Sequence, residues 1–388
     1  MTDGDGPSIG GDAQVKVLIA TPYFWPRIGG MENYARFLAR GLAEAGWEAA
    51  VVCGDPTVQR PVLTEVDNFA VWRLPIWKVV SNTPINLAWC WWLRRIIRLE
   101  RPDLINAHTP VPFMVDVVTW AAGNRPVVVT YHAATLRKPG GLAMSLITRG
   151  YLAVQWLTLG RARAIIAVSP YVSEQLARWR SKITVVTNAV TEVGAPRTAP
   201  GTGLVFVNNL EPTHRWKGMD MLLDALAVLK REATTITLTV VGDGADRPRY
   251  ERRVRELGLD HMVRFAGTQA GPERDALIRQ AAALVLYPTT ANDAFPTVML
   301  EAWAQGTTVV AAAIGSLPSL VHDDVTGLLV EPNNADALAD RLRAAMADPA
   351  HLAALGEAGR QLVAREYTWP RQVERTHAVF KDLARLSQ

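Results

Sequence analysis

The 388-residue sequence predicts an α/β protein with two doubly wound, Rossmann-like domains that face each other across a cleft. Short apolar, β-rich runs alternate with amphipathic stretches of about ten to fifteen residues, which indicates parallel sheets covered by helices. The alternation stops in a stretch rich in Pro, Gly and Thr, residues 191–203, and then starts again. The length also exceeds that of a typical single hydrophobic core, so two domains are expected.

Domain boundaries follow from the same pattern. We expect a loose, Gly-rich tail over residues 1–14, a first domain over 15–190, a linker over 191–203, a second domain over 204–368 and a C-terminal helix over 369–388. The tail lacks the apolar segment that a signal peptide requires.

The first domain is expected to open with a strand at residues 15–21, because the run VKVLIAT suits a strand buried on both faces. Gly29 and Gly30 then lead into a helix that ends at Gly46. The later strands of this domain are predicted at residues 48–54, 70–75, 103–109, 127–133, 163–169 and 183–189, and its later helices at 85–100, 113–123 and 170–179.

The second domain repeats the alternation of strands and helices. Its strands are predicted at residues 204–210, 237–244, 262–267, 283–289 and 307–313, and its helices at 219–231, 249–258, 273–282 and 292–306. A dinucleotide-binding domain with a separate substrate domain would use the same elements. The three-glycine GxGxxG fingerprint is absent, since RIGGM and VGDGADR both lack its spacing, and this argues against that alternative.

Composition and charge exclude several classes of protein. The net charge is +4 without any run of five Lys or Arg, so no nucleic-acid partner is expected. The two cysteines, Cys53 and Cys90, form no metal-binding motif, and no apolar run is long enough to span a membrane. We expect a cytoplasmic protein. The basic, Trp-rich stretch 77–102 fits either a helix packed on its own sheet or a surface that contacts an anionic membrane.

Two glycines and two cations predict anion-binding positions. Gly29 and Gly30 stand before a helix, whose unpaired amides and dipole attract an anion. Arg215 and Lys217 precede the predicted helix at 219–231 and could clamp a diphosphate. Ordinary turn glycines and an exposed basic loop would give the same local pattern.

The stretch NDAFPTVMLEAWAQG, residues 292–306, contains two carboxylates eight positions apart, Asp293 and Glu301. Pro296 fits the first position of a helix, where its missing N–H costs nothing. The free amides that follow would form a second anion site, at Thr297, Val298 and Met299. Both carboxylates could instead be structural, Glu301 in the core and Asp293 in a loop.

Two histidines follow predicted strands of the first domain, His108 in NAHTP and His132 in TYHAAT. A single His is more often structural, but two at successive strand ends indicate a site at the cleft. His132 could donate a hydrogen bond to a reacting oxygen or orient an acceptor.

The sequence as a whole resembles the family 4 retaining glycosyltransferases, which have the GT-B fold. The resemblance extends from about residue 15 to residue 385, and its most specific part is the pair of carboxylates at spacing eight. The motifs that carry it occur in the family's order: GG after the first strand, TYHA, VSPYV, TNAV, WKGMD, VVGDG, VRFAG, DAFPTVMLEAWAQGTTVVA and a terminal YTW helix.

The resemblance implies a UDP- or GDP-sugar donor bound mainly by the second domain and an acceptor bound by the first. The acceptor would be a saccharide, a lipid-linked glycan or a small molecule, and a mannose- or glucose-like hexosyl group would be transferred with retention of configuration. No metal and no cofactor are implied beyond the donor itself. The fold also implies that the C-terminal helix crosses back to the first domain.

Mapped onto this sequence, the resemblance implies that Glu301 bonds the donor ribose, Lys217 the diphosphate and Asp293 the sugar, with His132 beside the sugar. His132 and Asp293 are the catalytic candidates. The implied donor-binding set is Glu301, Lys217, Arg215, Asn209, Gly242, Arg264, Phe265, Phe295, Pro296, Thr297 and Val298. The implied phosphate and acceptor loop contains Gly29, Gly30 and His108.

Three positions depart from the family pattern. Asp293 stands where Glu is usual, Asn208 and Asn209 where Gly-Arg is usual, and Ala189 where Gly is usual. Arg215 could replace the missing arginine at the phosphate. The departures at Asp293, Asn208 and Asn209 leave open a homologue that binds a sugar nucleotide, or a partner chain, without turnover. A nucleotide-sugar 2-epimerase on the same fold is the other alternative.

Overall fold

The first sheet is made of strands that are apolar on both faces, as a parallel sheet between two helical layers requires. The computed structural model describes residues 15–27, 29–80, 82–134, 142–234 and 236–385. In this sheet the strand order is β10-β9-β8-β7-β1-β2-β4-β3, and only β3 runs antiparallel to its neighbour. Its strands are β1 (Lys16–Thr21), β2 (Glu48–Asp55), β3 (Val62–Val66), β4 (Phe69–Pro75), β7 (Leu104–Thr109), β8 (Val127–Tyr131), β9 (Ala164–Ala167) and β10 (Ile183–Val185).

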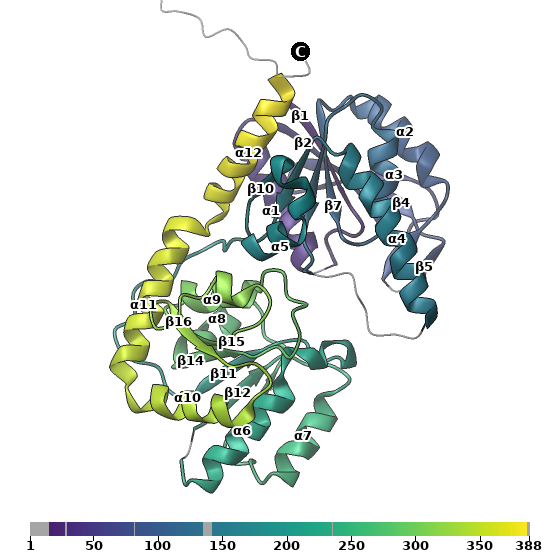
Figure 1. Cartoon of the computed structure of the whole chain (residues 1–388). Helices are drawn as coiled ribbons and strands as arrows, with labels where there is room; N and C mark the ends of the chain where they lie inside the picture. The colour runs from purple at the N-terminus through teal and green to yellow at the C-terminus, as the bar shows by residue number, and fades with distance from the viewer. Residues whose placement is uncertain (1–14, 28, 81, 135–141, 235, 386–388) are drawn as a thin grey trace, which may run out of the picture.

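Helices cover both faces of this sheet (Figure 1). On one side α3 packs between α2 and α4, while α1 packs against the C-terminal helix α12 on the other side. These helices and the short α5 are α1 (Gly30–Glu44), α2 (Trp89–Glu100), α3 (Met114–Ala121), α4 (Leu142–Arg161), α5 (Pro170–Gln175) and α12 (Trp369–Arg385).

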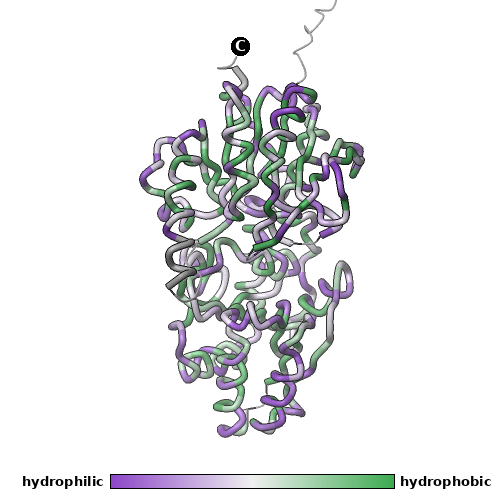
Figure 2. Tube along the Cα trace, turned by 90° about the vertical axis from the view of Figure 1, so that its right-hand side faces the viewer, coloured by the Kyte–Doolittle hydropathy of each residue, from purple (hydrophilic) through white to green (hydrophobic). Residues whose placement is uncertain are grey.

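The second sheet has six strands, all parallel, in the order β13-β12-β11-β14-β15-β16. The strands are β11 (Leu204–Val207), β12 (Leu238–Val241), β13 (Val263–Gly267), β14 (Ala283–Leu286), β15 (Thr308–Ala312) and β16 (Gly327–Val330). The helices are α6 (Met219–Arg231), α7 (Arg247–Glu256), α8 (Gly271–Gln280), α9 (Thr297–Ala304), α10 (Ala335–Ala347) and α11 (Pro349–Glu366). Figure 2 shows hydrophobic and hydrophilic segments alternating along the helices of both domains, as amphipathic helices require.

The C-terminal helix crosses back to the first domain, which confirms the predicted architecture. At the crossing, the Val190 amide donates to the Tyr367 carbonyl at 2.9 Å, and the Trp369 amide donates to the Val190 carbonyl at 3.3 Å. α12 then runs along α1, where Gly41 allows a very close approach: a Cβ there would lie 2.3 Å from a Val373 methyl carbon. Figure 1 shows α12 lying along the first domain after α11 has left the second.

The predicted linker, residues 191–203, has no regular structure but is bonded to the second domain. Arg197 donates to the carbonyl of Ala281 at 2.9 Å, and the Gly194 amide donates to the carbonyl of Ala304 at 2.8 Å. Arg279 donates in turn to the carbonyl of Ala195 at 2.8 Å. This segment therefore belongs physically to the second domain.

Several element boundaries differ from the prediction. The predicted helix at 85–100 begins only at Trp89, because β5 (Lys78–Val80) and β6 (Thr83–Ile85) form an antiparallel hairpin before it. The predicted helix at 292–306 is α9 alone, so Pro296 is the N-cap residue and not the first helical residue. The predicted helix at 170–179 ends at Gln175 and continues as a 3-10 helix.

Candidate active site

A cavity of about 430 Å³ lies between the two domains. The first domain contributes the start of α1 to its wall, with Gly29, Gly30 and Tyr34, and the second contributes Thr297 and Glu301 of α9. The cavity therefore brings together predicted residues from opposite domains. Trp369, at the start of α12, lines the same cavity and was not among the predicted site residues.

The start of α1 holds a carboxylate of the chain itself. Glu32 lies in the first turn and is buried, and a Cβ on Gly29 would meet its Oε2 at 2.3 Å. Burial raises the pKa of Glu32, and the Arg27 guanidinium, 3.5 Å away, acts in the opposite direction. An anionic ligand at this helix start would therefore have to approach beside Glu32, which was not among the predicted site residues.

The start of α9 is fixed by contacts from both domains. The Phe295 ring is buried against Tyr367, with ring centres 5.9 Å apart, and the Phe295 carbonyl accepts from Asn188 Nδ2 at 3.3 Å. The Met299 amide bonds the Pro296 carbonyl at 3.2 Å, whereas the structure as described gives the Thr297 and Val298 amides no backbone partner. Those two amides remain available to an anion at the helix start.

Glu301 lies further along α9 and is 24% exposed at the cavity. Burial raises the pKa of its carboxyl group, while Arg274 of α8, with Nη1 3.4 Å from Oε1, acts to lower it. Arg274 also has a buried Nε without a hydrogen-bond partner. Glu301 was predicted from the sequence but Arg274 was not, because a lone arginine on an amphipathic helix carries no local signal.

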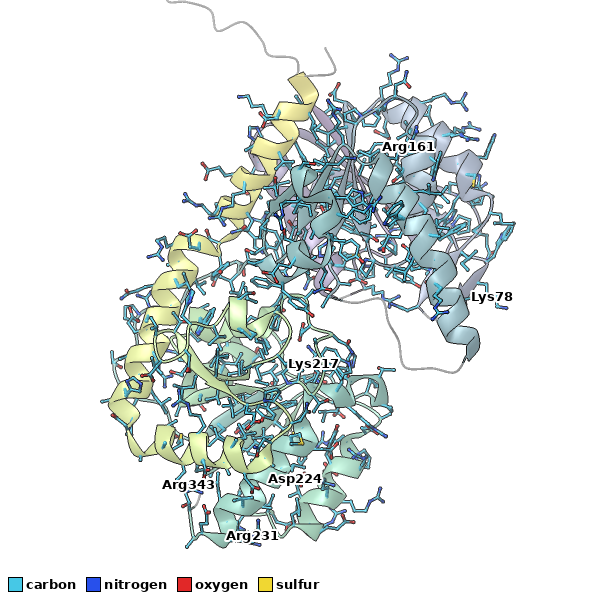
Figure 3. All side chains as sticks on the ribbon, viewed as in Figure 1. Lys78, Arg161, Lys217, Asp224, Arg231 and Arg343 are labelled. Carbon is cyan, nitrogen blue, oxygen red and sulfur yellow. The ribbon has the colours of Figure 1, made fainter. Side chains whose placement is uncertain are left out.

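Lys217 and Asp293 form an ion pair at the edge of the second domain that faces the first (Figure 3). Lys217 Nζ donates to Asp293 Oδ2, and the two side chains are 19% and 16% exposed. Ser316 Oγ holds the Asp293 backbone by donating to its carbonyl at 2.8 Å. The structure thus joins the residue predicted for the diphosphate to the residue predicted for the sugar.

A glycine sets the position of Lys217. Gly218 ends the 3-10 helix Pro212–Lys217 with φ of 87°, and a Cβ on it would lie 1.7 Å from the Tyr287 carbonyl oxygen. Only glycine fits this close approach of two backbones.

The two predicted histidines belong to one buried hydrogen-bond chain. His108 Nδ1 lies 2.9 Å from His132 Nε2, and His108 Nε2 lies 2.9 Å from Asn106 Oδ1. Asn106 Nδ2 lies 3.2 Å from the Val128 carbonyl oxygen and 2.8 Å from Thr130 Oγ1. The chain therefore runs from the middle of the sheet to the end of β8.

This chain determines which ring nitrogens carry protons. A carbonyl oxygen only accepts hydrogen bonds, so the Asn106 atom that contacts the Val128 carbonyl must be the amide nitrogen, Nδ2. The other atom, Oδ1, is then an acceptor, and His108 Nε2 must carry the proton that it accepts. Burial lowers the pKa of His108 well below its usual value and that of His132 to about 3, so both rings are neutral. His108 Nδ1 then accepts from His132 Nε2–H, which leaves His132 Nδ1 as a hydrogen-bond acceptor. The network favours a role in orienting a substrate hydroxyl over donation to a reacting oxygen.

Two family models match consecutive parts of the chain. Glycosyltransferase Family 4 matches residues 28–192, and Glycosyl transferases group 1 matches residues 201–362. The chain belongs to these glycosyltransferases. The boundary between the two matches falls within the segment that joins the two domains.

Curated relatives of this glycosyltransferase include transferases with different acceptors. Glycogen synthase of Mycobacterium tuberculosis is 26% identical over 383 residues, with 91% of each chain covered. D-inositol 3-phosphate glycosyltransferase of Salinispora tropica is 28% identical, with 89% of this chain and 79% of the relative covered. These relatives support a glycosyltransferase without indicating which sugar is transferred.

Solved structures similar to the glycosyltransferase share its two-domain GT-B fold. Sucrose-phosphate synthase of Thermosynechococcus elongatus superposes with a TM-score of 0.75 at 22% identity, covering 96% of this chain and 100% of that one. Anabaena HepE in complex with UDP gives a TM-score of 0.74 at 19% identity, covering 95% and 100%.

Arg215 of this glycosyltransferase is engaged within the second domain. Its guanidinium makes two hydrogen bonds to Asp246, with Nε 2.5 Å from Oδ2 and Nη2 2.8 Å from Oδ1, although half of the side chain is exposed. The Asp246 carboxylate therefore fills the fork that would otherwise bind a phosphate. The predicted phosphate contact would require this pair to open.

Four of the predicted donor-binding residues lie in β13 or just after the ends of β11 and β12: Asn209, Gly242, Arg264 and Phe265. Gly242, with φ of 134°, brings its backbone so close to Asn208 that a Cβ would lie 1.8 Å from the Asn208 carbonyl oxygen. Asn209 and Arg264 are exposed, and Phe265 is half-buried. Their contact with a donor stays a prediction.

Among the residues that the structure describes, no group of three or more His, Cys, Asp or Glu side chains could hold a metal ion. Within the same residues, no helix is long and apolar enough to cross a membrane. The groups of these residues that could contact an anion at the cleft are the helix-start amides together with Lys217 and Arg274, which are paired with Asp293 and Glu301 respectively.

Proposed function

We propose that the protein transfers a hexosyl group from a UDP- or GDP-sugar to a hydroxyl group of a saccharide, glycolipid or small-molecule acceptor, with retention of configuration and without a metal. The observation that carries this proposal is the Lys217–Asp293 pair beside the start of α9, with Glu301 across the cavity from α1. Lys217 and the Thr297 and Val298 amides would stabilise the charge of the leaving diphosphate. Glu301 would bond the ribose hydroxyls.

The proposed reaction is a front-face displacement. The bond from the anomeric carbon to the diphosphate oxygen breaks, and the acceptor oxygen bonds to the same face of that carbon. The acceptor proton passes to the departing phosphate oxygen. Asp293 does not act as a nucleophile in this mechanism, because its carboxylate is paired with Lys217. Asp293 holds the sugar instead. Neutral His132 accepts a hydrogen bond from a sugar hydroxyl through Nδ1.

Thermal unfolding with UDP, GDP and their sugars identifies the donor, because a ligand that binds only the folded state stabilises it by mass action, by about 2.7 kcal/mol at a hundred times its Kd. UDP-sugars are tested first, since HepE was solved with UDP-glucose. Mass spectrometry of the product made with the stabilising donor then tests transfer, and NMR of the anomeric proton and carbon reads the configuration of the new linkage. Transfer with an α-linked product from an α-linked donor is expected, and an inverted linkage would overturn the proposed mechanism.

The same incubation separates the alternatives. An epimerised donor in the absence of acceptor would identify a 2-epimerase. Stabilisation by a sugar nucleotide without transfer to any acceptor and without hydrolysis would identify a non-catalytic homologue.

A further inference from the structure

The charge of the protein is concentrated in one segment. Residues 76–163 contain eleven Lys and Arg but only three Asp and Glu, whereas the whole chain contains 41 and 37. Acidic residues therefore outnumber basic residues in the rest of the chain. The segment comprises the β5–β6 hairpin, α2, α3 and α4, with the central strands β7 and β8 between them.

The three acids in this segment form no ion pair with its described Lys and Arg residues. Glu100 accepts from Trp72 Nε1 at 2.7 Å and pairs with Lys16 at 2.9 Å. Asp103 accepts the Lys16 backbone amide at 2.7 Å. Asp116 is buried at the start of α3, where it accepts from the Phe113 amide at 2.9 Å and from Thr158 Oγ1 at 2.6 Å. In the described part of the segment, the exposed Lys and Arg side chains therefore have no carboxylate partner within it.

Most of the exposed large hydrophobic side chains lie in the same segment. Thirteen of them are exposed among the residues that the structure describes, and eleven lie in residues 76–163. Four are tryptophans, which are 65%, 56%, 51% and 46% exposed at Trp77, Trp91, Trp120 and Trp156. Exposed hydrophobic side chains are ordinary when they are scattered, so their concentration in one segment requires an explanation.

Arginines accompany three of these tryptophans. Arg95 lies 5.5 Å from the ring centre of Trp91, Arg161 lies 5.1 Å from that of Trp120, and Arg178 lies 3.7 Å from that of Trp156. Each pair presents a flat aromatic ring and a cation together at the surface. This combination suits the headgroup level of a bilayer, where Trp rings lie between water and acyl chains and arginines meet lipid phosphates.

The fold places these groups on one side of the first domain. α3 packs between α2 and α4, and the three helices lie on the side opposite α1 and α12 (Figure 1). Lys78 of the hairpin and Arg161 of α4 both lie on this side, whereas Arg231 lies at the far end of the second domain (Figure 3). We call the exposed side chains of the described residues 76–80, 82–134 and 149–163 the basic face.

We propose that the basic face docks the protein on an anionic lipid bilayer. Charge complementarity selects an anionic surface, and the exposed Trp and Leu side chains select a bilayer over a nucleic acid, which offers no acyl layer to bury them. Lys78, at the hairpin end of the face, lies toward the second domain (Figure 3). Docking through this end would therefore bring the second domain close to the membrane. Such docking does not depend on which donor or acceptor the protein uses.

Co-sedimentation of the full chain with vesicles tests the proposal. We expect binding to phosphatidylcholine mixed with phosphatidylglycerol, weaker binding at high salt, and little binding to phosphatidylcholine alone. The variant Arg94→Gln/Arg95→Gln/Arg98→Gln removes three exposed charges of α2 and should weaken binding about a hundredfold. Trp77→Ser/Trp91→Ser should weaken it as well, with salt dependence retained.

The matched control is Arg231→Gln/Arg252→Gln/Arg255→Gln, which removes three exposed charges from the second domain. It should bind vesicles like the wild type. An equal loss of vesicle binding in this control variant would overturn the proposal. So would a wild-type protein that does not bind anionic vesicles, or one whose basic face binds only a partner protein. Thermal unfolding verifies that each variant is folded. Each variant should also transfer sugar to a water-soluble acceptor at the wild-type rate. This second measurement separates failure of docking from failure of the proposed activity.

Discussion

Asp293 and Glu301 have different neighbours, and their substitutions should therefore have different kinetic effects. Glu301→Gln keeps the shape but removes the charge beside Arg274, so donor affinity should fall about tenfold, which corresponds to about 1.4 kcal/mol, with kcat little changed. Asp293→Asn leaves Lys217 without its partner at the reacting end, so kcat should fall about a hundredfold. Steady-state kinetics with the stabilising donor measure both.

Asp260→Asn is the control for these variants, because Asp260 is an exposed carboxylate of the second domain. It should leave both constants unchanged. Wild-type kinetics in both Glu301→Gln and Asp293→Asn would contradict the placement of the donor between these residues.

Because burial keeps His132 neutral, we expect the folded protein to lose stability in mild acid. Its folded-state pKa is lowered to about 3 by burial, whereas an unfolded histidine titrates near 6.5, so the unfolded chain binds more protons between these values. Stability should therefore fall as the pH drops below about 6.5, by up to about 2 kcal/mol at pH 5 for this one group. Denaturant unfolding from pH 7 to 5 measures the slope.

His132→Gln should reduce this slope, while His261→Gln, at an exposed position, should not. Nitrogen-15 correlation spectra add an independent reading of the same network. Both buried rings should carry their proton on Nε2, and a proton on Nδ1 of either ring would show that the Asn106 contact does not set the tautomer.

At the residue scale, the side chains that stand at strand or helix ends could be predicted from the sequence, but their partners could not. Glu301 is conspicuous because a carboxylate is rare in an apolar helix, but Arg274 is one of many arginines and only the packing of α8 against α9 brings it close. Arg215 and Asp246 are 31 positions apart, so their pairing is equally hidden in the sequence.

At the scale of elements, Gly218 connects the fold to the site. Gly218→Ala would place a Cβ 1.7 Å from the Tyr287 carbonyl oxygen and would strain a φ of 87°, so it should destabilise the protein by at least about 2 kcal/mol. It should also lower kcat, because Lys217 is the preceding residue. Urea unfolding and kinetics with the stabilising donor measure the two effects.

Gly150→Ala provides the contrast. Gly150 lies within α4, and a Cβ added there would have nothing within 4 Å, so alanine should raise stability by up to about 1 kcal/mol. If both substitutions were neutral, close backbone packing at Gly218 would not be what positions Lys217.

Most strands and helices could be predicted because their apolar periodicity is local, as in β1 and α6. The prediction missed the strands β3, β5, β6 and β16 and the helices α4, α10 and α11. The errors lie where a local pattern is ambiguous. The helix was predicted to start at Ile85 because apolar residues follow directly, but Ile85 ends β6 and pairs with Lys78 of β5 in a hairpin. Residues 292–306 were predicted as one helix, but α9 begins only at Thr297. The segment before it is positioned by the contact between the Phe295 and Tyr367 rings, which no local sequence pattern reveals.

At the scale of the whole molecule, the cleft depends on contacts that cross between the domains. Asn188 bonds the Phe295 carbonyl, and the Val190 backbone bonds the residues on either side of Thr368. The apolar core is continuous across this junction, from the first sheet through Phe295 and α9. The start of α1 and the start of α9 are thereby kept on opposite walls of one cavity.

Docking of α12 on α1 should consequently control both stability and activity. Trp369 packs against Tyr34 and Phe37, with ring centres 5.3 and 5.1 Å apart, and it lines the cavity. Gly41→Ala would force a methyl group to 2.3 Å from Val373 and should cost about 1 to 3 kcal/mol, while moving Trp369 out of the cleft and lowering activity. Val373→Ala alone should cost a similar amount through the cavity that it leaves. The double variant should recover at least about 1 kcal/mol of the summed loss, together with part of the activity, because the new methyl group fills the space of the old ones. Urea unfolding of all four proteins closes this cycle, and strictly additive losses would mean that α12 is not seated on α1 at Gly41.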